Sequence, residues 1–310
     1  MGKVLVTGGA GFIASHVVDT LVEQGHDVVI IDDLSRGSIC NINPRAKFYN
    51  MDIRSSNLND IFSKERPEIV NHHAARTSVI HSLSEPVDDA EVNIIGSLNL
   101  LQNCVKWQVK KIIYASSGGA IYGEPVYLPC DENHLIAPLS PYGVSKYAVE
   151  LYLTPYLNNY GLSYTILRYA NVYGPRQAFS GEAAVVAKFC NQMLRGLDVS
   201  INGNGEQERD FVYVQDIVRA NILAMEQPEN RVYNLGTGNS ISINQIFLLL
   251  KCLIGYNKEP LYVPHLKGEI YKTSLIAAKA RQELEWVPEV SLKDGLKITI
   301  DFYKRSEHFN

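Results

Sequence analysis

No segment of the 310-residue sequence approaches the ~20 consecutive apolar residues that a membrane-spanning helix needs. The first residues carry one lysine and then turn to glycine, so we expect no signal peptide, which needs a longer apolar core and a cleavage site. No basic run is present and the net charge is -4, which disfavours nucleic acid and anionic membranes as partners. These features predict a cytoplasmic protein.

Metal signals are also scarce. The five cysteines are odd in number and widely scattered, without metal or redox spacing, so we interpret them as reduced thiols that mostly pack in the interior. His72 and His73 are adjacent in an apolar run. Because successive side chains of a strand point to opposite faces, this pair cannot easily share one ion. The sequence therefore predicts no metal site.

Short apolar runs alternate with helical patterns through the first half of the chain. The runs are continuous, which is typical of strands buried on both faces, and comprise Lys3–Thr7, Asp27–Ile31, Ala46–Asn50, Glu68–His73, Lys111–Ser116 and Ser163–Tyr169. Helical spacing follows Phe12 and returns in Asn93–Trp107 and Tyr142–Tyr160. This alternation predicts an α/β protein with a Rossmann-type doubly wound parallel sheet.

The pattern changes after about residue 170, where glycine, proline and asparagine become more frequent. Strands there are short, and we expect helices over Ile243–Ile254, Leu275–Leu284 and Leu292–Tyr303. We predict an NAD-binding Rossmann domain over residues 1–169. A smaller mixed α/β domain over residues 170–310 would bind mainly substrate, with some of its segments returning to the first domain.

A glycine-rich loop, Thr7–Ala14, connects the first predicted strand to the first helix. Gly8 and Gly11 would let the backbone approach a pyrophosphate, and the free N–H groups of a helix that begins near Phe12 and Ile13 favour that anion. Asp32 follows the second strand, 21 residues after Gly11, with Asp33 beside it. A carboxylate there accepts hydrogen bonds from ribose hydroxyls and repels a 2′-phosphate. The carboxylate of Asp32 therefore favours NAD over NADP. Arg36 is the competing signal, because a nearby arginine can hold a 2′-phosphate.

Tyr142 and Lys146 lie four residues apart in a predicted helix, and therefore on one face of it. A phenol ordinarily titrates near pH ~10. We expect a neighbouring ammonium and a cationic nicotinamide to lower the pKa of Tyr142 and make it a general base. Ser117 follows the fifth strand, at the edge where such folds bind ligands, and could hydrogen-bond the substrate oxygen.

Further motifs accompany these residues: Ile121-Tyr122-Gly123, Arg168-Tyr169-Ala170-Asn171, Arg209-Asp210-Phe211-Val212-Tyr213-Val214 and Asn234-Leu235-Gly236-Thr237-Gly238. With the glycine loop, Asp32 and the Tyr-x-x-x-Lys pair, they resemble the extended short-chain dehydrogenases/reductases. The resemblance spans nearly the whole chain and is greatest to the branch that epimerises UDP-hexoses at C4 with a bound NAD that is regenerated in each turnover.

This resemblance implies that NAD takes a hydride from C4 of a UDP-sugar while Tyr142 removes the O4 proton. Lys146 would bind the nicotinamide ribose. The family carries a serine or threonine after the fifth strand. Counting forward from the end of that strand places it at Ser117, whereas counting back from Tyr122 places it at Gly118. We choose Ser117, with Ser116 in reserve, because glycine cannot do the work of a hydroxyl.

The resemblance also implies contacts elsewhere in the chain. Cofactor contacts would come from Asp52, Ile53, Ala74, Ala75, Asn93, Ser116 and Tyr169. Substrate contacts would come from Asn171, Arg209, Lys267 and Thr273. The diphosphate-binding arginine of related sequences is replaced by Leu266, so Lys267 or His265 would have to substitute for it. Thr273 leaves room that a bulky aromatic residue would fill, which favours tolerance of N-acetylated sugars.

Other functions remain open. A dehydratase or a decarboxylating synthase of the same fold needs an acid beside the serine, where this chain has Gly118 and Gly119, and this argues for epimerisation. A non-catalytic NAD-sensing protein would keep the glycine loop but lose the Tyr/Lys pair, and this chain has both. Apolar residues on more than one face of Asn93–Trp107 and Tyr142–Tyr160 predict a homodimer with a four-helix interface.

Overall fold

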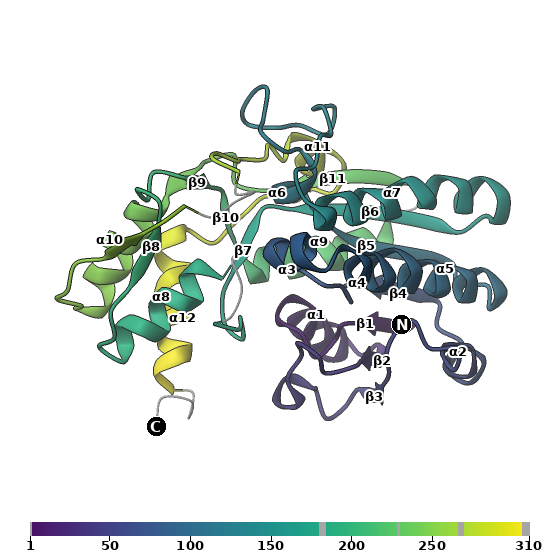
Figure 1. The fold of residues 1–310 in the computed structure, drawn as a ribbon. Helices are drawn as coiled ribbons and strands as arrows, with labels where there is room; N and C mark the ends of the chain where they lie inside the picture. Colours follow the sequence, from purple (N-terminus) through teal and green to yellow (C-terminus); the bar gives the residue numbers. More distant parts are fainter. Residues whose placement is uncertain (1, 180–183, 228–229, 266–269, 306–310) are drawn as a thin grey trace.

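A seven-stranded sheet forms the centre of the computed structural model, which describes residues 2–179, 184–227, 230–265 and 270–305 (Figure 1). All of its neighbouring strands are parallel, in the order β11-β6-β5-β4-β1-β2-β3. Its strands are β1 Lys3–Thr7, β2 Asp27–Asp32, β3 Lys47–Asn50, β4 Ile69–His72, β5 Lys111–Ser117, β6 Ser163–Tyr169 and β11 Arg231–Leu235. The predicted Rossmann-type sheet and its first six strands are confirmed.

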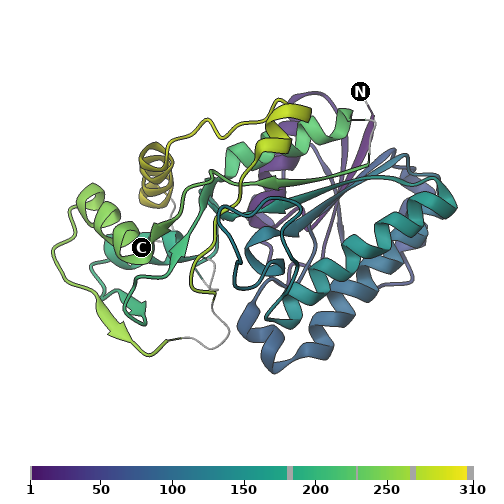
Figure 2. The same cartoon turned by 90° about the horizontal axis from the view of Figure 1, so that it is seen from above.

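Helices cover both faces of this sheet, which is why its strands are continuously apolar. Helices α1 (Phe12–Glu23) and α9 (Val214–Glu226) contact each other, and α1 packs with Val4, Val6, Val28 and Ile30 in one core cluster. The intervening strand residues, such as Leu5, face the opposite side. That side is covered by α2 Leu58–Glu65, α5 Gly96–Lys106 and α7 Pro141–Tyr160 (Figure 2).

Short elements lie beside these layers: η1 Ile39–Asn41, α3 Val79–Ser84, α4 Pro86–Ala90, the π-turn η2 Glu91–Ile95, α6 Gly118–Ile121 and α11 Ala278–Glu283. Two predicted helices need correction. Asn93–Trp107 begins as a π-turn and becomes regular at Gly96. Leu275–Leu284 is helical only in α11, because the backbone around Leu275 is extended and bridges to Cys130.

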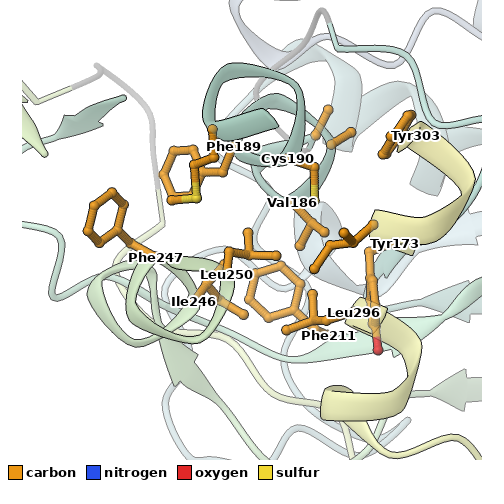
Figure 3. Packing of buried hydrophobic residues seen from close by; sticks show 14 of the residues in the cluster. Tyr173, Val186, Phe189, Cys190, Phe211, Ile246, Phe247, Leu250, Leu296 and Tyr303 are labelled. Carbon is orange, nitrogen blue, oxygen red and sulfur yellow. The ribbon is translucent and has the colours of Figure 1, made fainter. Parts of the chain in front are cut away.

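The remaining elements pack around a separate core, which we call the C-terminal cluster. They are β7 Asn171–Tyr173, α8 Val185–Leu194, β8 Ser200–Asn202, β9 Glu208–Arg209, β10 Phe211–Tyr213, β12 Ile241–Ser242, α10 Ile243–Ile254, β13 Leu261–Val263 and α12 Leu292–Arg305. Figure 3 shows side chains of this core, among them Phe189, Phe211 and Leu250, packed between its helices. The predicted helix Ile243–Ile254 is confirmed, and the helix that begins at Leu292 extends two residues beyond its predicted end.

The sheet and the C-terminal cluster meet at the start of α1. Strand β1 lies between β4 and β2, the place where strand order reverses and where folds of this kind bind ligands. Phe12 and Ile13 pack against the core of the C-terminal cluster. His16 contacts the carbonyl of Pro175 at 2.9 Å across the same junction. The glycine loop therefore lies at the boundary between the two cores.

Candidate active site

The glycine loop approaches the segment after β4 so closely that only glycine fits. Gly8 has φ of +70°, and a Cβ placed on it would lie 2.8 Å from the backbone nitrogen of Ala74. The amide of Gly11 donates to the carbonyl of Gly8 at 2.9 Å, which closes the turn before α1 begins at Phe12. The first turn of a helix has N–H groups without helical partners, so this loop suits an anion such as a pyrophosphate.

Asp32 is held in place at the end of β2 by two backbone amides. Its Oδ2 accepts from Ala10 at 3.0 Å and its Oδ1 accepts from Leu34 at 2.8 Å. Burial raises the pKa of this carboxyl, and the two amide hydrogen bonds oppose the rise. Each carboxylate oxygen keeps acceptor capacity for a ribose hydroxyl. Asp33 is exposed and accepts from Ser35 instead.

The residues predicted to meet the adenine follow β3. The Asp52 carboxylate accepts from Nη2 of Arg54 at 2.6 Å, and this hydrogen bond lowers its pKa. Ile53 is buried, and its carbonyl accepts from Asn99 at 2.7 Å. Both residues are thus fixed by neighbours on their own side of the sheet.

Asn93 fixes the loop that carries Ala74 and Ala75. Its Oδ1 accepts from the Arg76 amide at 2.7 Å, and its Nδ2 donates to the Arg76 carbonyl at 3.0 Å. Asn93 lies in the π-turn before α5 and is buried. Such turns are frequent at functional sites, because the extra residue redirects a side chain.

Tyr142, Lys146 and Ser117 come together at the end of β5. Helix α7 begins with Pro141, and the Ser140 hydroxyl caps it by accepting from Gly143 at 3.2 Å, so Tyr142 and Lys146 lie in its first two turns. The Ser117 side chain lies close enough to the Tyr142 phenol to lower its pKa. Nζ of Lys146 donates to the Ala115 carbonyl at 2.9 Å and lies 5.1 Å from the centre of the Tyr114 ring.

Burial moves the pKa values of Tyr142 and Lys146 in opposite directions. It raises the pKa of Tyr142 to about 12, against the lowering effect of Ser117. It lowers the pKa of Lys146 to about 8, against the raising effect of the Asp89 and Glu150 carboxylates. The protein's own groups alone therefore do not lower the phenol pKa, and the lowering by a bound cationic nicotinamide stays a prediction. Desolvation disfavours the phenolate, and the ammonium is bonded to Ala115.

Glu150 was missed from the sequence and lies one turn beyond Lys146 on α7. It accepts a hydrogen bond from the Ser116 hydroxyl and forms a buried ion pair with Arg168 at 2.6 Å. Ser116 is therefore bonded away from Tyr142, and Ser117 is the serine beside the phenol. The i, i+4 spacing from Lys146 to Glu150 was the one signal available in the sequence.

Asp89 was missed as well and lies at the end of α4. It is fully buried, and accepts from Ser145 at 2.6 Å and from Asn93 at 3.0 Å. Nothing local in the sequence connects Asp89 to Lys146, because the contact joins residues that lie more than fifty positions apart.

The predicted substrate residues lie on the side of the C-terminal cluster. A Cβ placed on Gly119 would lie 3.5 Å from Oδ1 of Asn171 and 4.0 Å from Oγ of Ser117, so these two side chains approach the same point. Arg209 donates to the carbonyl of Glu208 at 2.9 Å, and the same carbonyl accepts from the amide of buried Thr273 at 3.2 Å. Lys267 lies outside the described residues.

His72 and His73 have separate partners. His72 contacts the hydroxyls of Thr7 at 2.7 Å and Ser97 at 2.9 Å, while His73 contacts the Tyr169 hydroxyl at 3.1 Å. Within the described ranges we find neither a cluster of three or more potential metal ligands nor a helix long and apolar enough to span a membrane.

Fold and site together define a class, that of Rossmann-type enzymes which transfer a proton beside a bound dinucleotide. Residues 4–236 match the NAD dependent epimerase/dehydratase family. Because this match covers most of the chain, the protein belongs to that family. The residues described above fit NAD, since the glycine loop, Asp32 and the Asn93-fixed loop surround one edge of the sheet.

Three solved structures are similar over nearly the full chain. UDP-glucose 4-epimerase of Thermotoga maritima, solved with UDP-glucose, has a TM-score of 0.96 and 52% identity, covering 98% of this chain and 99% of that one. UDP-glucose 4-epimerase of Thermus thermophilus, solved with NAD, has a TM-score of 0.94 and 39% identity, with coverage of 98% and 99%. UDP-N-acetylglucosamine 4-epimerase of Methanobrevibacter ruminantium, in complex with UDP-N-acetylmuramic acid, has a TM-score of 0.92 and 36% identity, with coverage of 98% and 98%.

Lys146→Met tests the cost of burying the ammonium. The pKa of Lys146 in the folded protein, about 8, lies below its ordinary value of 10.5. Between these values the unfolded chain binds more protons, so the wild type gains stability as pH rises through this window. We expect the variant to be more stable at pH 7 by on the order of 3 kcal/mol and to lose most of that margin at pH 10.

Urea denaturation at both pH values measures this difference. Lys293→Met is the control, because the Lys293 side chain is exposed. If the two variants change the free energy of unfolding by the same amount at both pH values, burial of the Lys146 ammonium does not destabilise the protein.

Proposed function

We propose that this protein is a UDP-glucose 4-epimerase, which interconverts UDP-glucose and UDP-galactose through a transient 4-keto sugar. The observation that carries the proposal is the trio of buried Tyr142 and Lys146 with half-buried Ser117 beside a dinucleotide loop. Support comes from the 52% identity, over nearly the whole of both chains, to the T. maritima enzyme solved with UDP-glucose.

The chain's own residues would handle the proton of the sugar hydroxyl. Tyr142 takes the O4 proton as the hydride leaves C4, and returns it after the keto sugar has turned, so the net redox change is zero. Ser117 hydrogen-bonds the same oxygen, and Lys146 places a positive charge one helical turn away. Oxidised NAD, when bound, supplies the hydride acceptor and a positive charge that lowers the phenol pKa from about 12. Burial of Tyr142 and Lys146 excludes water from the keto sugar.

Packing around Gly118 favours epimerisation over dehydration. A dehydratase would need an acidic side chain beside Ser117, at Gly118 or Gly119. A Cβ placed on Gly118 would lie 2.4 Å from Cδ1 of Leu275, so a carboxylate there would have to displace this buried side chain. We therefore favour a reaction that moves only the hydrogens at C4 and O4.

Tyr142→Phe tests the proton transfer. We expect it to reduce the exchange of UDP-glucose and UDP-galactose by at least ~10²-fold, because a phenyl ring cannot accept the O4 proton. The purified variant should still release NAD when it is denatured. The assay contains no added NAD and is followed by separation of the two UDP-sugars.

Tyr256→Phe is the matched control. Tyr256 is buried to a similar extent, but its hydroxyl donates to the Leu197 carbonyl in the C-terminal cluster. Full activity in Tyr142→Phe, or an equal loss in Tyr256→Phe, would contradict the assigned role.

We further propose that N-acetylated sugars are accepted. Thr273 is buried on the extended segment that passes Gly118, and threonine fills less of this space than an aromatic residue. Support comes from the similarity to an epimerase of N-acetylated UDP-sugars.

Thr273→Tyr should lower kcat/KM for UDP-GalNAc at least ~10-fold more than for UDP-galactose, because the larger ring occupies the space of the acetamido group. Thr273→Ser, which keeps that space open, should retain both activities. Steady-state kinetics with the two substrates measure this ratio. A wild type that converts UDP-galactose but shows no detectable conversion of UDP-GalNAc would exclude the proposal.

We propose a homodimer as well, formed through α7 together with α3 and α4. Exposed apolar side chains gather on these contacting elements and on η2, which contacts α4 and α7: Ile80, Leu83, Val87, Ile95, Val144, Leu151 and Tyr152. Of the segment Asn93–Trp107, which was expected to share the interface, Ile95 belongs to this patch, whereas α5 itself has no exposed large apolar side chain among its described residues. A patch of this kind is typical of a protein–protein contact.

Leu151→Glu should convert the dimer to a monomer, because it places a charge in an apolar interface. Leu248→Glu on α10 is the matched control, since Leu151 is 57% exposed and Leu248 is 58% exposed. Sedimentation velocity measures the mass. A wild-type monomer, or equal dissociation by both variants, would reject this interface.

A cytoplasmic location is part of the same proposal. All five cysteines are free, and Cys104, Cys130 and Cys190 are buried. Free thiols of this kind suit a reducing compartment.

A further inference from the structure

His73, at the end of β4, carries a buried nitrogen that lacks a protein partner. Its Nε2 contacts the Tyr169 hydroxyl at 3.1 Å, and the two rings are stacked at 6.1 Å. Its Nδ1 is inaccessible to solvent and has no hydrogen-bond partner among the described residues. Buried polar atoms are nearly always paired, so this nitrogen requires an explanation.

The hydrogen bonds around Tyr169 identify which nitrogen carries the proton. Nδ2 of Asn221 donates to the Ile217 carbonyl at 2.9 Å and to the Tyr169 hydroxyl at 2.9 Å. A carbonyl only accepts, so this contact orients the Asn221 amide, and Oδ1 of Asn221 accepts from Asn71 at 3.0 Å. The Tyr169 hydroxyl accepts from Nδ2 of Asn221, and its own proton faces two acceptors, Nε2 of His73 at 3.1 Å and Oδ1 of Asn221 at 3.3 Å. Because Oδ1 is the more distant of the two and already accepts from Asn71, we assign the proton to the hydrogen bond with Nε2 of His73. A neutral imidazole that accepts at Nε2 carries its proton on Nδ1.

His73 is neutral at physiological pH. Burial, with a smaller contribution from the Lys146 ammonium, lowers its pKa to about 3. The ring therefore has one N–H, and that group is a donor without an acceptor in the described part of the protein.

His73 lies beside the dinucleotide loop. A Cβ placed on Gly8 would lie 3.0 Å from the carbonyl carbon of His73, so the His73 backbone lies against the glycine loop. On its other side the ring stacks on Tyr169, at the end of β6. A ligand bound at this edge of the sheet is the group that can supply an acceptor for Nδ1–H.

We propose that His73 is a cofactor-binding residue whose Nδ1–H donates a hydrogen bond to an oxygen of bound NAD. The proposal rests on the NAD dependence of the proposed function and not on its sugar specificity. Tyr169, Asn221 and Asn71 act as positioning residues, because they determine the tautomer and the orientation of the ring.

Three substitutions separate the two nitrogens of His73. His73→Asn keeps an amide nitrogen at the place of Nδ1, His73→Gln keeps one at the place of Nε2, and His73→Phe keeps neither. We expect His73→Phe and His73→Gln to bind NAD about tenfold more weakly, and His73→Asn to bind within about threefold of the wild type. Titration calorimetry of NAD into the nucleotide-free full-length protein measures these affinities.

Two results would overturn the proposal. One is wild-type affinity in His73→Gln, which would mean that Nδ1 contributes nothing. The other is an affinity of His73→Asn for NAD as low as that of His73→Phe. This result would mean that His73 acts structurally, through its contact with Tyr169, and not as a donor to NAD. Nitrogen-15 spectra of the histidine ring give an independent readout, because a proton on Nε2 contradicts the tautomer on which the donor depends.

Smaller ligands locate the acceptor oxygen. A weaker affinity of His73→Gln for ADP indicates an oxygen of the diphosphate or of the adenosine ribose, and one that begins with ADP-ribose indicates a hydroxyl of the second ribose. An effect confined to NAD indicates the carboxamide. If the wild type binds NAD but does not exchange UDP-glucose and UDP-galactose, the proposed sugar specificity is wrong. The test of His73 still holds in that case, because it measures NAD binding alone.

Discussion

The buried ammonium of Lys146 is the constraint on which the rest of the site depends. A charge removed from water is unstable unless neighbouring groups stabilise it, and burial lowers the pKa of this lysine to about 8. The Ala115 carbonyl and the Tyr114 ring contact it directly, and the Asp89 and Glu150 carboxylates favour its charged form. These contacts hold Lys146 in place one helical turn beyond Tyr142 on α7.

The same groups connect the helices and strands that carry the site. Asp89 links α4 to α7 through Ser145, and Glu150 links α7 to β6 through Arg168. The positions of the reactive side chains are thus determined by packed helices and strands rather than by loops alone. A site held in this way is preorganised, so its dipoles need little reorientation during a proton transfer.

The first six strands were predictable, because burial on both faces leaves each strand continuously apolar. The seventh, Arg231–Leu235, was not, since it begins with a charged residue, contains Asn234, and joins the sheet only by pairing with β6. The pairing of Tyr142 with Lys146 and the glycine loop before Phe12 were also predictable. The rise in the phenol pKa that burial causes was not predicted, because the depth of burial around Tyr142 cannot be read from neighbouring residues.

By itself the sequence determined what the covalent chain imposes over short distances: the closed turn at Gly8, the shared helical face of Tyr142 and Lys146, and the alternation of strand and helix. Only the tertiary structure decided which distant groups meet. The tautomer of His73 depends on Tyr169 and on Asn221 of α9, and these residues become neighbours through strand pairing and helix packing. Such contacts cannot be recognised from neighbouring residues in the sequence. They are stabilised by burial, and burial exists only once the chain has folded.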